Sequence, residues 1–209
     1  MNRFALAVLS AIILTAGCAE PPASPTAGGS CQGFGACGGD PTGSWSIFDI
    51  CYDEELFREA TRSAITAPAC ADWLVATDVS VTGRLSFGAD QLVSNLVLRQ
   101  TLDTVWTQEC LDSLTNEPTA LSQATCDALG LSLSMDSEAG AECEVRDGLC
   151  HCLANVVSTS QSETPYTVLG NQIDTPMGRS DFCVDGDDLL FRGKADAVRP
   201  ALVMILRRD

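Results

Sequence analysis

Hydrophobic and polar residues alternate most clearly between residues 79 and 87. Apolar residues or glycine take every second position there and polar residues stand between them, a period of two that predicts a half-buried β-strand. Residues 88–90 supply a turn. A partner strand is expected after it, with Leu92, Leu96, Leu98 and Leu102 on one face.

Further short apolar segments are bounded by turn residues such as Gly170-Asn171 and Asp185-Gly186-Asp187. Short strands separated by such turns predict a mainly β fold: an antiparallel barrel or, alternatively, a β-sandwich. The additional strands are expected at residues 45–51, 104–110, 150–158, 166–169, 181–184, 189–192 and 201–207.

Two segments instead repeat their apolar residues at helical spacing. Residues 53–64 place acids early and arginines late, which suits the helix dipole. Residues 119–129 end at Gly130, which is read as a stop signal. The prediction is therefore a β domain with two short helical insertions.

The N-terminus begins with Arg3 and continues with a 13-residue run, residues 4–16, that is almost entirely apolar. That run is too short to span a bilayer, which needs roughly 20 helical residues. A charged start, a short apolar run and small residues at its end predict a signal peptide over residues 1–17.

The sequence before Cys18 resembles the lipobox of bacterial lipoproteins, although Thr15 stands where leucine is usual. The resemblance implies lipidation of Cys18 by acyl chains such as palmitate. The alternative is an ordinary cleaved signal peptide that happens to contain a cysteine.

Residues 18–43 are predicted to be a lipidated tether and residues 44–209 a disulfide-stapled β domain. Within residues 19–43, seven residues are glycine and four are proline, so this segment cannot bury enough apolar surface to fold by itself. Cys31 and Cys37 lie in it, and they either close a small loop together or staple its end to the domain.

The chain has 11 cysteines, and assigning Cys18 to lipid leaves an even number. An even set in an exported protein predicts disulfides and an oxidising compartment, although their connectivity cannot be deduced from the sequence. The disulfide candidates are Cys31, Cys37, Cys51, Cys70, Cys110, Cys126, Cys143, Cys150, Cys152 and Cys183.

The full chain has 12 basic and 28 acidic residues, and removal of residues 1–17 takes away one arginine, so the mature charge is −17. A chain this acidic repels phosphate backbones, which excludes nucleic acid as a partner. Its contact with a membrane is therefore expected through the N-terminal lipid. By resemblance to the usual sorting rule for lipoproteins, Ala19 after Cys18 favours the outer membrane over the inner.

Three motifs suggest chemistry, and each has a plainer explanation. Gly33-Phe34-Gly35-Ala36-Cys37-Gly38 fits a dinucleotide-binding pattern by letters, but no strand precedes it. Cys150-His151-Cys152, with Cys143, could ligate zinc, yet in a strand His151 points away from both cysteines. Structural disulfides beside a surface histidine are favoured. Residues 185–188 lack the spacing of a calcium loop and are read as a turn.

The sequence also offers few candidate catalytic residues, because His151 is the only histidine and no G-x-S-x-G nucleophile motif is present. No catalytic, metal-ligating or cofactor-binding residue is therefore assigned, and no cofactor is expected.

Gly43-Ser44-Trp45 resembles the G-x-W that opens lipocalin-like barrels. The resemblance implies that Trp45 closes the barrel floor, with an arginine from near the last strand over it. The predicted last strand does run into Arg207 and Arg208. The mid-chain T-D-Y signature of lipocalins is missing. The overall layout looks like uncharacterised cysteine-rich envelope lipoproteins, and Gly43 and Trp45 are expected to be structural.

These observations favour a non-enzymatic, lipid-anchored envelope protein whose lipocalin-like barrel holds a small apolar ligand. The alternative is a structural or adhesion module with a filled interior that binds other envelope proteins, and an envelope hydrolase comes third. The interior of the fold separates the first two, because a ligand barrel needs an apolar cavity above about 300 Å³.

Overall fold

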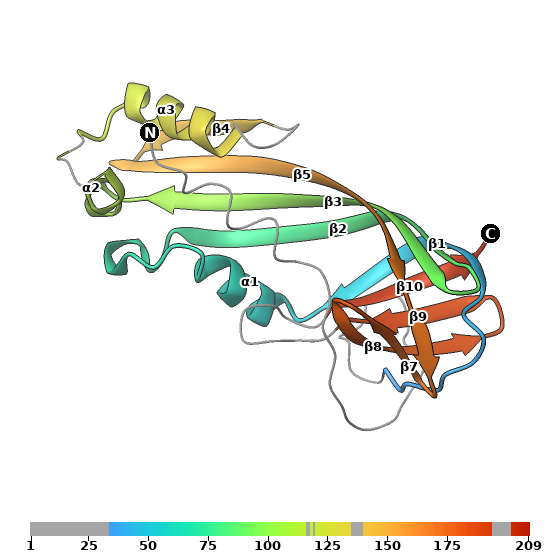
Figure 1. Ribbon diagram of the computed structural model, residues 1–209. Coiled ribbons are helices and arrows are strands. Elements are labelled where there is room, and N and C mark those ends of the chain that lie inside the picture. The colour runs from blue at the N-terminus through green and yellow to red at the C-terminus, as the bar shows by residue number, and fades with distance from the viewer. Residues whose placement is uncertain (1–33, 116–117, 119, 135–139, 194–201) are drawn as a thin grey trace. The chain divides into compact units, whose positions relative to one another are not determined.

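A computed structural model describes residues 34–115, 118, 120–134, 140–193 and 202–209, and the structural statements below concern these residues (Figure 1). The predicted signal peptide, Cys18 and Cys31 lie outside them. The described residues belong to two compact units. Unit 1 draws on residues 58–79 and 99–158, and unit 2 on residues 34–57, 80–98 and 159–209.

The strands form one sheet with the order β4-β5-β3-β2-β1-β10-β9-β8-β7-β6. Three of them, β2, β3 and β5, contribute residues to both units. The strand bounds are β1 Gly43–Tyr52, β2 Leu74–Phe87, β3 Gln91–Trp106, β4 Ala141–Arg146, β5 Leu149–Pro165, β6 Thr167–Leu169, β7 Gln172–Thr175, β8 Gly178–Asp185, β9 Asp188–Arg192 and β10 Leu202–Arg208.

Short helices interrupt the strands: α1 Glu54–Arg62, α2 Gln108–Thr115, α3 Gln123–Ser134 and the 3₁₀ turn Pro68–Cys70. None of the helices in the described part of the chain is long and apolar enough to cross a membrane.

The expected mainly β, antiparallel fold with helical insertions is confirmed. Among the described residues the sheet is not closed into the expected barrel, because β4 and β6 stand at the two ends of the strand order and each pairs there on one side only. The sandwich-like alternative fits this open sheet. A closed barrel would need hydrogen bonds between the two end strands. The sequence did not show which strands stand at the ends of the sheet.

In unit 2, strands β1, β10, β9, β8 and β7 lie side by side (Figure 1). Burial alternates along these strands. In β9, Leu189 and Phe191 are buried, while Asp188, Leu190 and Arg192 are only partly covered. The alternation predicted in β2 likewise buries Leu85 and Phe87. One core cluster results, made of Trp45, Leu85, Phe87, Leu92, Tyr166, Ile173, Phe182, Leu189, Phe191, Met204 and Leu206.

Unit 1 has its own core, built around two indole rings whose centroids lie 5.3 Å apart, Trp73 and Trp106. Helix α3 lies over β4 at one side of this unit (Figure 1). The buried cluster consists of Cys70, Trp73, Leu74, Leu102, Trp106, Cys110, Leu111, Cys126, Cys150, Cys152, Ala154 and Val156.

Two local predictions in unit 1 were wrong. The strand expected at residues 104–110 stops at Trp106, and α2 begins at Gln108, where the Thr107 side chain accepts a hydrogen bond from the Cys110 N–H at 3.1 Å. Thr107 thus caps the helix, a signal hidden inside an apparently alternating run. Gly130 was read as the end of a helix, yet α3 continues to Ser134. A Cβ at Gly130 would lie 3.1 Å from the Cys143 Sγ, so this glycine permits close packing of α3 on β4.

Candidate functional site

Trp45 is the centre of the predicted G-x-W site, and its side chain is completely buried in unit 2. Its Nε1–H donates a hydrogen bond to the carbonyl oxygen of Pro41 at 2.7 Å. A buried indole needs such a partner, because leaving its N–H unpaired would cost free energy. Trp45 is therefore held both by burial and by a hydrogen bond.

Arg208 covers the ring of Trp45. The two residues are partners in the β1–β10 register, and the Arg208 guanidinium carbon lies 4.2 Å from the ring centroid. Arg208 also donates to the carbonyl oxygen of Thr42 at 3.0 Å. The neighbouring Arg207 instead stacks on Phe48 at 3.7 Å. Of the two arginines at the end of β10, Arg208 is therefore the one that lies over Trp45.

Gly43 allows the chain to turn beneath Arg208. Its φ is 127°, and a Cβ there would lie 2.8 Å from the Arg208 Nη1 atom. The preceding turn is fixed by Asp40, whose carboxylate accepts a hydrogen bond from the Thr42 N–H at 2.9 Å. Hydrogen bonds from the Thr42 side chain and backbone lower the pKa of Asp40. The set of Asp40, Pro41, Thr42, Gly43, Trp45 and Arg208 is called the Trp45 closure below.

Residues 34–39, which were predicted to belong to the tether, are part of unit 2. Phe34 is buried, with the Arg192 guanidinium carbon 4.6 Å from its ring centroid. Gly38 forms a parallel bridge with Cys183, and Cys37 is disulfide-bonded to Cys183. The tether boundary predicted at residue 43 therefore falls inside unit 2. The segment also leads into strand β1, whereas a dinucleotide site would need a helix opening on its glycines.

Tyr166 is expected to make the free energy of unfolding depend on pH. Its ring is buried, and its hydroxyl donates to the carbonyl oxygen of Gly88 at 2.6 Å. Burial, followed by the charges of Asp40 and Asp90, raises the pKa of Tyr166 above its ordinary value of 10.0. A raised folded-state pKa means that stability is full below pH 10 and falls as the pH climbs towards the folded value.

We expect the free energy of unfolding to decline from about pH 10 upward, and Tyr166→Phe to remove that part of the decline. Urea titrations of both proteins across that range measure it. Identical pH profiles for the wild type and Tyr166→Phe would contradict the assignment.

Nine of the ten predicted disulfide cysteines are described, and all nine are oxidised. Cys51 is among them. The four pairs that the structure gives are Cys37–Cys183, Cys70–Cys110, Cys126–Cys150 and Cys143–Cys152. Of the two possibilities left open for Cys37, the structure thus selects the staple to the domain.

Cys150, His151 and Cys152 alternate along β5, as the sequence suggested. The two cysteines are buried in the core of unit 1 and bond to different partners. His151 lies on the other face, where its Nδ1 atom accepts a hydrogen bond from Arg146 at 3.0 Å. His151 therefore does not share a ligand centre with its neighbouring cysteines.

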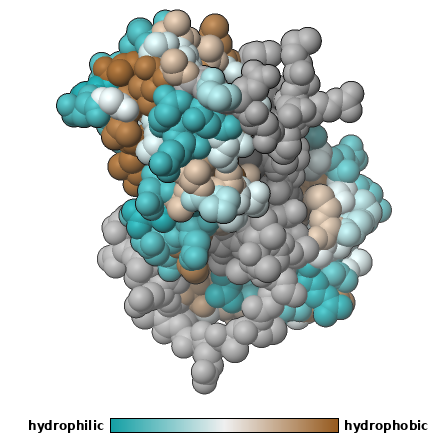
Figure 2. Space-filling view, turned by 90° about the vertical axis from the view of Figure 1, so that its left-hand side faces the viewer, coloured by the Kyte–Doolittle hydropathy of each residue, from teal (hydrophilic) through white to brown (hydrophobic). Residues whose placement is uncertain are grey.

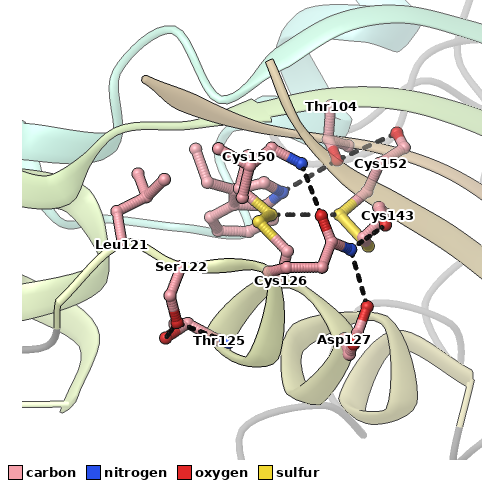
Figure 3. The surroundings of a disulfide bond; sticks show 12 residues. Thr104, Leu121, Ser122, Thr125, Cys126, Asp127, Cys143, Cys150 and Cys152 are labelled. Carbon is pink, nitrogen blue, oxygen red and sulfur yellow. Dashed lines mark hydrogen bonds between the residues drawn. A yellow bond between two sulfur atoms is a disulfide. The ribbon is translucent and has the colours of Figure 1, made fainter. Parts of the chain in front are cut away.

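The two disulfides in this region form a four-sulfur cluster (Figure 3). Cys126 comes from α3, Cys143 from β4, and Cys150 and Cys152 from β5. The sulfurs of Cys150 and Cys152 lie 3.9 Å apart, and those of Cys143, Cys150 and Cys152 are all within 4.8 Å of one another. We call these four residues the sulfur cluster.

Gln123 of α3 binds the backbone of β4 at Cys143 and Val145, so it joins the helix to this end strand. Its amide nitrogen donates to the Cys143 carbonyl at 3.0 Å and to the Asp127 carboxylate at 2.8 Å. Its amide oxygen accepts from the Val145 N–H at 3.0 Å. The Gln123 side chain thus pairs two backbone groups of β4 that would otherwise lie open at the edge of the sheet.

Sequence reasoning did not identify Gln123, because neither β4 nor the packing of α3 on it was predicted. It also did not identify Thr104, which is fully buried, accepts the Trp106 indole N–H at 2.8 Å and donates to the Cys152 carbonyl at 3.3 Å. A polar residue in an alternating strand carries no signal of such a role.

Large apolar side chains are exposed in both units. On the face turned to the viewer in Figure 2, apolar residues gather towards the upper left. In unit 1 the exposed ones are Val75, Leu114, Leu131, Val145 and Leu153, and in unit 2 they are Phe48, Leu56, Val168, Leu169 and Met177.

Comparison with known proteins gives no guide to this site, since no protein-family model, no curated protein and no solved structure matches the chain.

Proposed function

We propose that this chain is a non-enzymatic lipoprotein module of the bacterial envelope that binds other envelope proteins. The observation that carries the choice is the cluster of large side chains buried in unit 2. Trp45, Phe182, Ile173, Leu189 and Leu206 are all completely buried in a single cluster. A ligand barrel keeps an apolar cavity at this place, whereas a module with a packed interior uses its outer surface.

The Trp45 closure supports a lipocalin-like origin for the end of unit 2. It combines the opening G-x-W, the buried indole and an arginine of the last strand over the ring. In this proposal the closure persists on an open sheet, and large side chains take the volume that a lipocalin gives to its ligand.

The two end strands of the sheet differ in a way that suggests where a partner binds. The backbone of β4 is capped by Gln123. Strand β6 has only β7 as a neighbour in the described sheet, carries no charge, and exposes Val168 and Leu169. Uncharged edge strands readily accept an additional strand. We infer that an extended segment of another envelope protein pairs with β6.

The oxidised cysteines support an oxidising location, and the charge of −17 for a chain starting at Cys18 disfavours direct adsorption to anionic lipid. Acyl chains on Cys18 would hold the protein at the membrane despite this negative charge.

The anchor has a direct test. Cys18→Ser should abolish incorporation of labelled palmitate, because the thiol that carries the lipid is gone, and should leave the protein unprocessed or released. Labelling and sodium carbonate washing of membranes measure the two effects. Membrane association that survives the carbonate wash unchanged in Cys18→Ser would contradict lipidation.

Site-specific photo-crosslinking in cells tests the partner surface. A photoreactive residue at Val168 on the open edge should give a discrete adduct with another protein. The same residue at Val145 on the capped edge is the matched control, since both positions are valines of end strands with similar exposure, 42% and 37%. Equal adducts at both positions, or none at Val168, would contradict the proposed edge.

Native mass spectrometry of the purified mature protein distinguishes the module from a ligand barrel. We expect the mass of the lipidated chain alone. A co-purified apolar small molecule that stays bound to unit 2 would overturn the filled-interior proposal and restore ligand binding.

A further inference from the structure

The sulfur cluster brings four cysteines of three different elements to one place in unit 1. Three of its sulfurs already lie within 4.8 Å of one another, and the fourth, that of Cys126, is bonded to Cys150. Cys126, Cys150 and Cys152 are buried, and Cys143 is partly exposed on β4. Two separate structural bridges would not need this proximity, since each could stabilise the unit by itself.

Four thiolates at such distances match a tetrahedral metal site. Zinc binds cysteine sulfur at about 2.3 Å, which places tetrahedral ligand sulfurs about 3.8 Å apart. The Cys150 and Cys152 sulfurs are 3.9 Å apart in the oxidised protein. Once its bond to Cys150 opens, Cys126 can approach the same centre by rotation of its side chain.

We propose that the reduced sulfur cluster is a tetrathiolate site for a soft divalent cation such as Zn²⁺. Two molecules of a dithiol reduce the two disulfides to four thiols and leave as two disulfides. The four thiols then release four protons on binding Zn²⁺, and the centre has a net charge of −2. In the oxidising envelope the disulfides are the resting state, and a dithiol reductant converts them to the metal-binding state.

The exposure of the cysteines indicates where reduction begins. A thiolate reaches Cys143 most readily, because it is the only one of the four that is not fully buried. Attack on its sulfur releases Cys152 as a thiolate 3.9 Å from the Cys150 sulfur. Cys152 can then form a bond to Cys150 and release Cys126 as a thiolate. The second thiol of the reductant frees Cys143, which re-forms its bond to Cys152 and releases Cys150. A second dithiol then reduces the Cys143–Cys152 bond, and all four residues are thiols.

The surrounding contacts can hold the four residues in place after both bridges open. Gln123 ties α3 to β4, and Cys143 and Cys152 are partners in the β4–β5 register. Thr104 binds the Cys152 carbonyl from β3. None of these contacts depends on a disulfide, so metal ligands on all three elements remain positioned.

Cobalt titration of the reduced mature protein, in detergent and without oxygen, tests the proposal. Cobalt(II) is the probe because tetrahedral cobalt thiolates absorb visible light and zinc does not. We expect a cobalt–thiolate spectrum that saturates at one equivalent and is displaced by one equivalent of Zn²⁺. The oxidised protein should give none.

Two double variants make the result specific. Cys143→Ser with Cys152→Ser should weaken cobalt binding by at least about tenfold, because two ligands are lost. Cys70→Ser with Cys110→Ser removes another bridge of unit 1 and should leave the spectrum unchanged. Near-ultraviolet circular dichroism, to which the Trp73–Trp106 pair contributes, reports whether unit 1 remains folded.

Absence of the spectrum in the reduced protein would overturn the proposal, whether unit 1 stays folded or has unfolded. A spectrum of equal strength in the Cys143→Ser, Cys152→Ser variant would overturn it as well. Reduction that unfolds unit 1, followed by refolding on addition of one equivalent of metal, would support it as metal-coupled folding.

Discussion

Replacing Trp45 by alanine should lower the free energy of unfolding by about 3–5 kcal/mol, the usual loss when a large aromatic side chain is removed from a core. The indole is completely buried, so the substitution leaves a cavity among the large residues of unit 2. It also leaves the Pro41 carbonyl without its donor and removes the ring beneath Arg208. Guanidinium titration followed by far-ultraviolet circular dichroism measures the loss.

Phe48→Ala is the matched control for Trp45→Ala. Phe48 lies in the same strand, at the irregularity between Ile47 and Asp49, and is 55% exposed. Its contact with Arg207 is a surface one, so we expect a change of at most about 1 kcal/mol. If both variants shift the unfolding midpoint equally, Trp45 is not the centre of a core and the Trp45 closure loses its structural role.

Removing the Cys37–Cys183 bridge should cost about 4–5 kcal/mol, more than removing any other described bridge. It joins residues 146 positions apart, whereas Cys143 and Cys152 are only nine apart. A disulfide stabilises chiefly by restricting the unfolded chain, and this effect grows with the logarithm of the loop length. For Cys143–Cys152 the same relation gives about 2.5 kcal/mol. The other bridges inside the long loop shorten it and keep the figure from rising further.

Paired alanine variants, Cys37→Ala with Cys183→Ala and Cys143→Ala with Cys152→Ala, compare the two losses under one set of denaturant conditions. The first pair should also loosen residues 34–39 from β8, where backbone hydrogen bonds such as that between Gly38 and Val184 and the buried Phe34 ring would remain. Limited proteolysis would detect cleavage there. Equal losses in the two variants would contradict the chain-entropy explanation.

Local patterns were sufficient for most of the strands. The alternation at residues 79–87 lies in β2, and the leucines from Leu92 to Leu102 lie on β3. The final apolar run is β10, and the helix expected at residues 53–64 is α1. These predictions succeeded because periodicity reports burial directly, without knowledge of which element lies opposite.

Patterns failed where an element depends on its neighbours. Helix α2 was read as the end of a strand, and β4 was not predicted, since its exposed charged residues resemble a loop. Gly130 was predicted to end a helix, although it lies within α3 and allows the helix to pack closely against Cys143. In each case the deciding contact comes from a residue distant in the sequence.

The candidate site divides in the same way. The sequence by itself determined the cysteine inventory, the acidic charge, and the strand that follows Gly43-Ser44-Trp45, because these follow from composition and from a short pattern. Only the tertiary structure decided which cysteines pair, that Arg208 and not Arg207 covers Trp45, and that four sulfurs meet beside Gln123. Pairing and convergence depend on strand order and register, and a single chain encodes these through the sum of many long-range contacts that no local pattern displays.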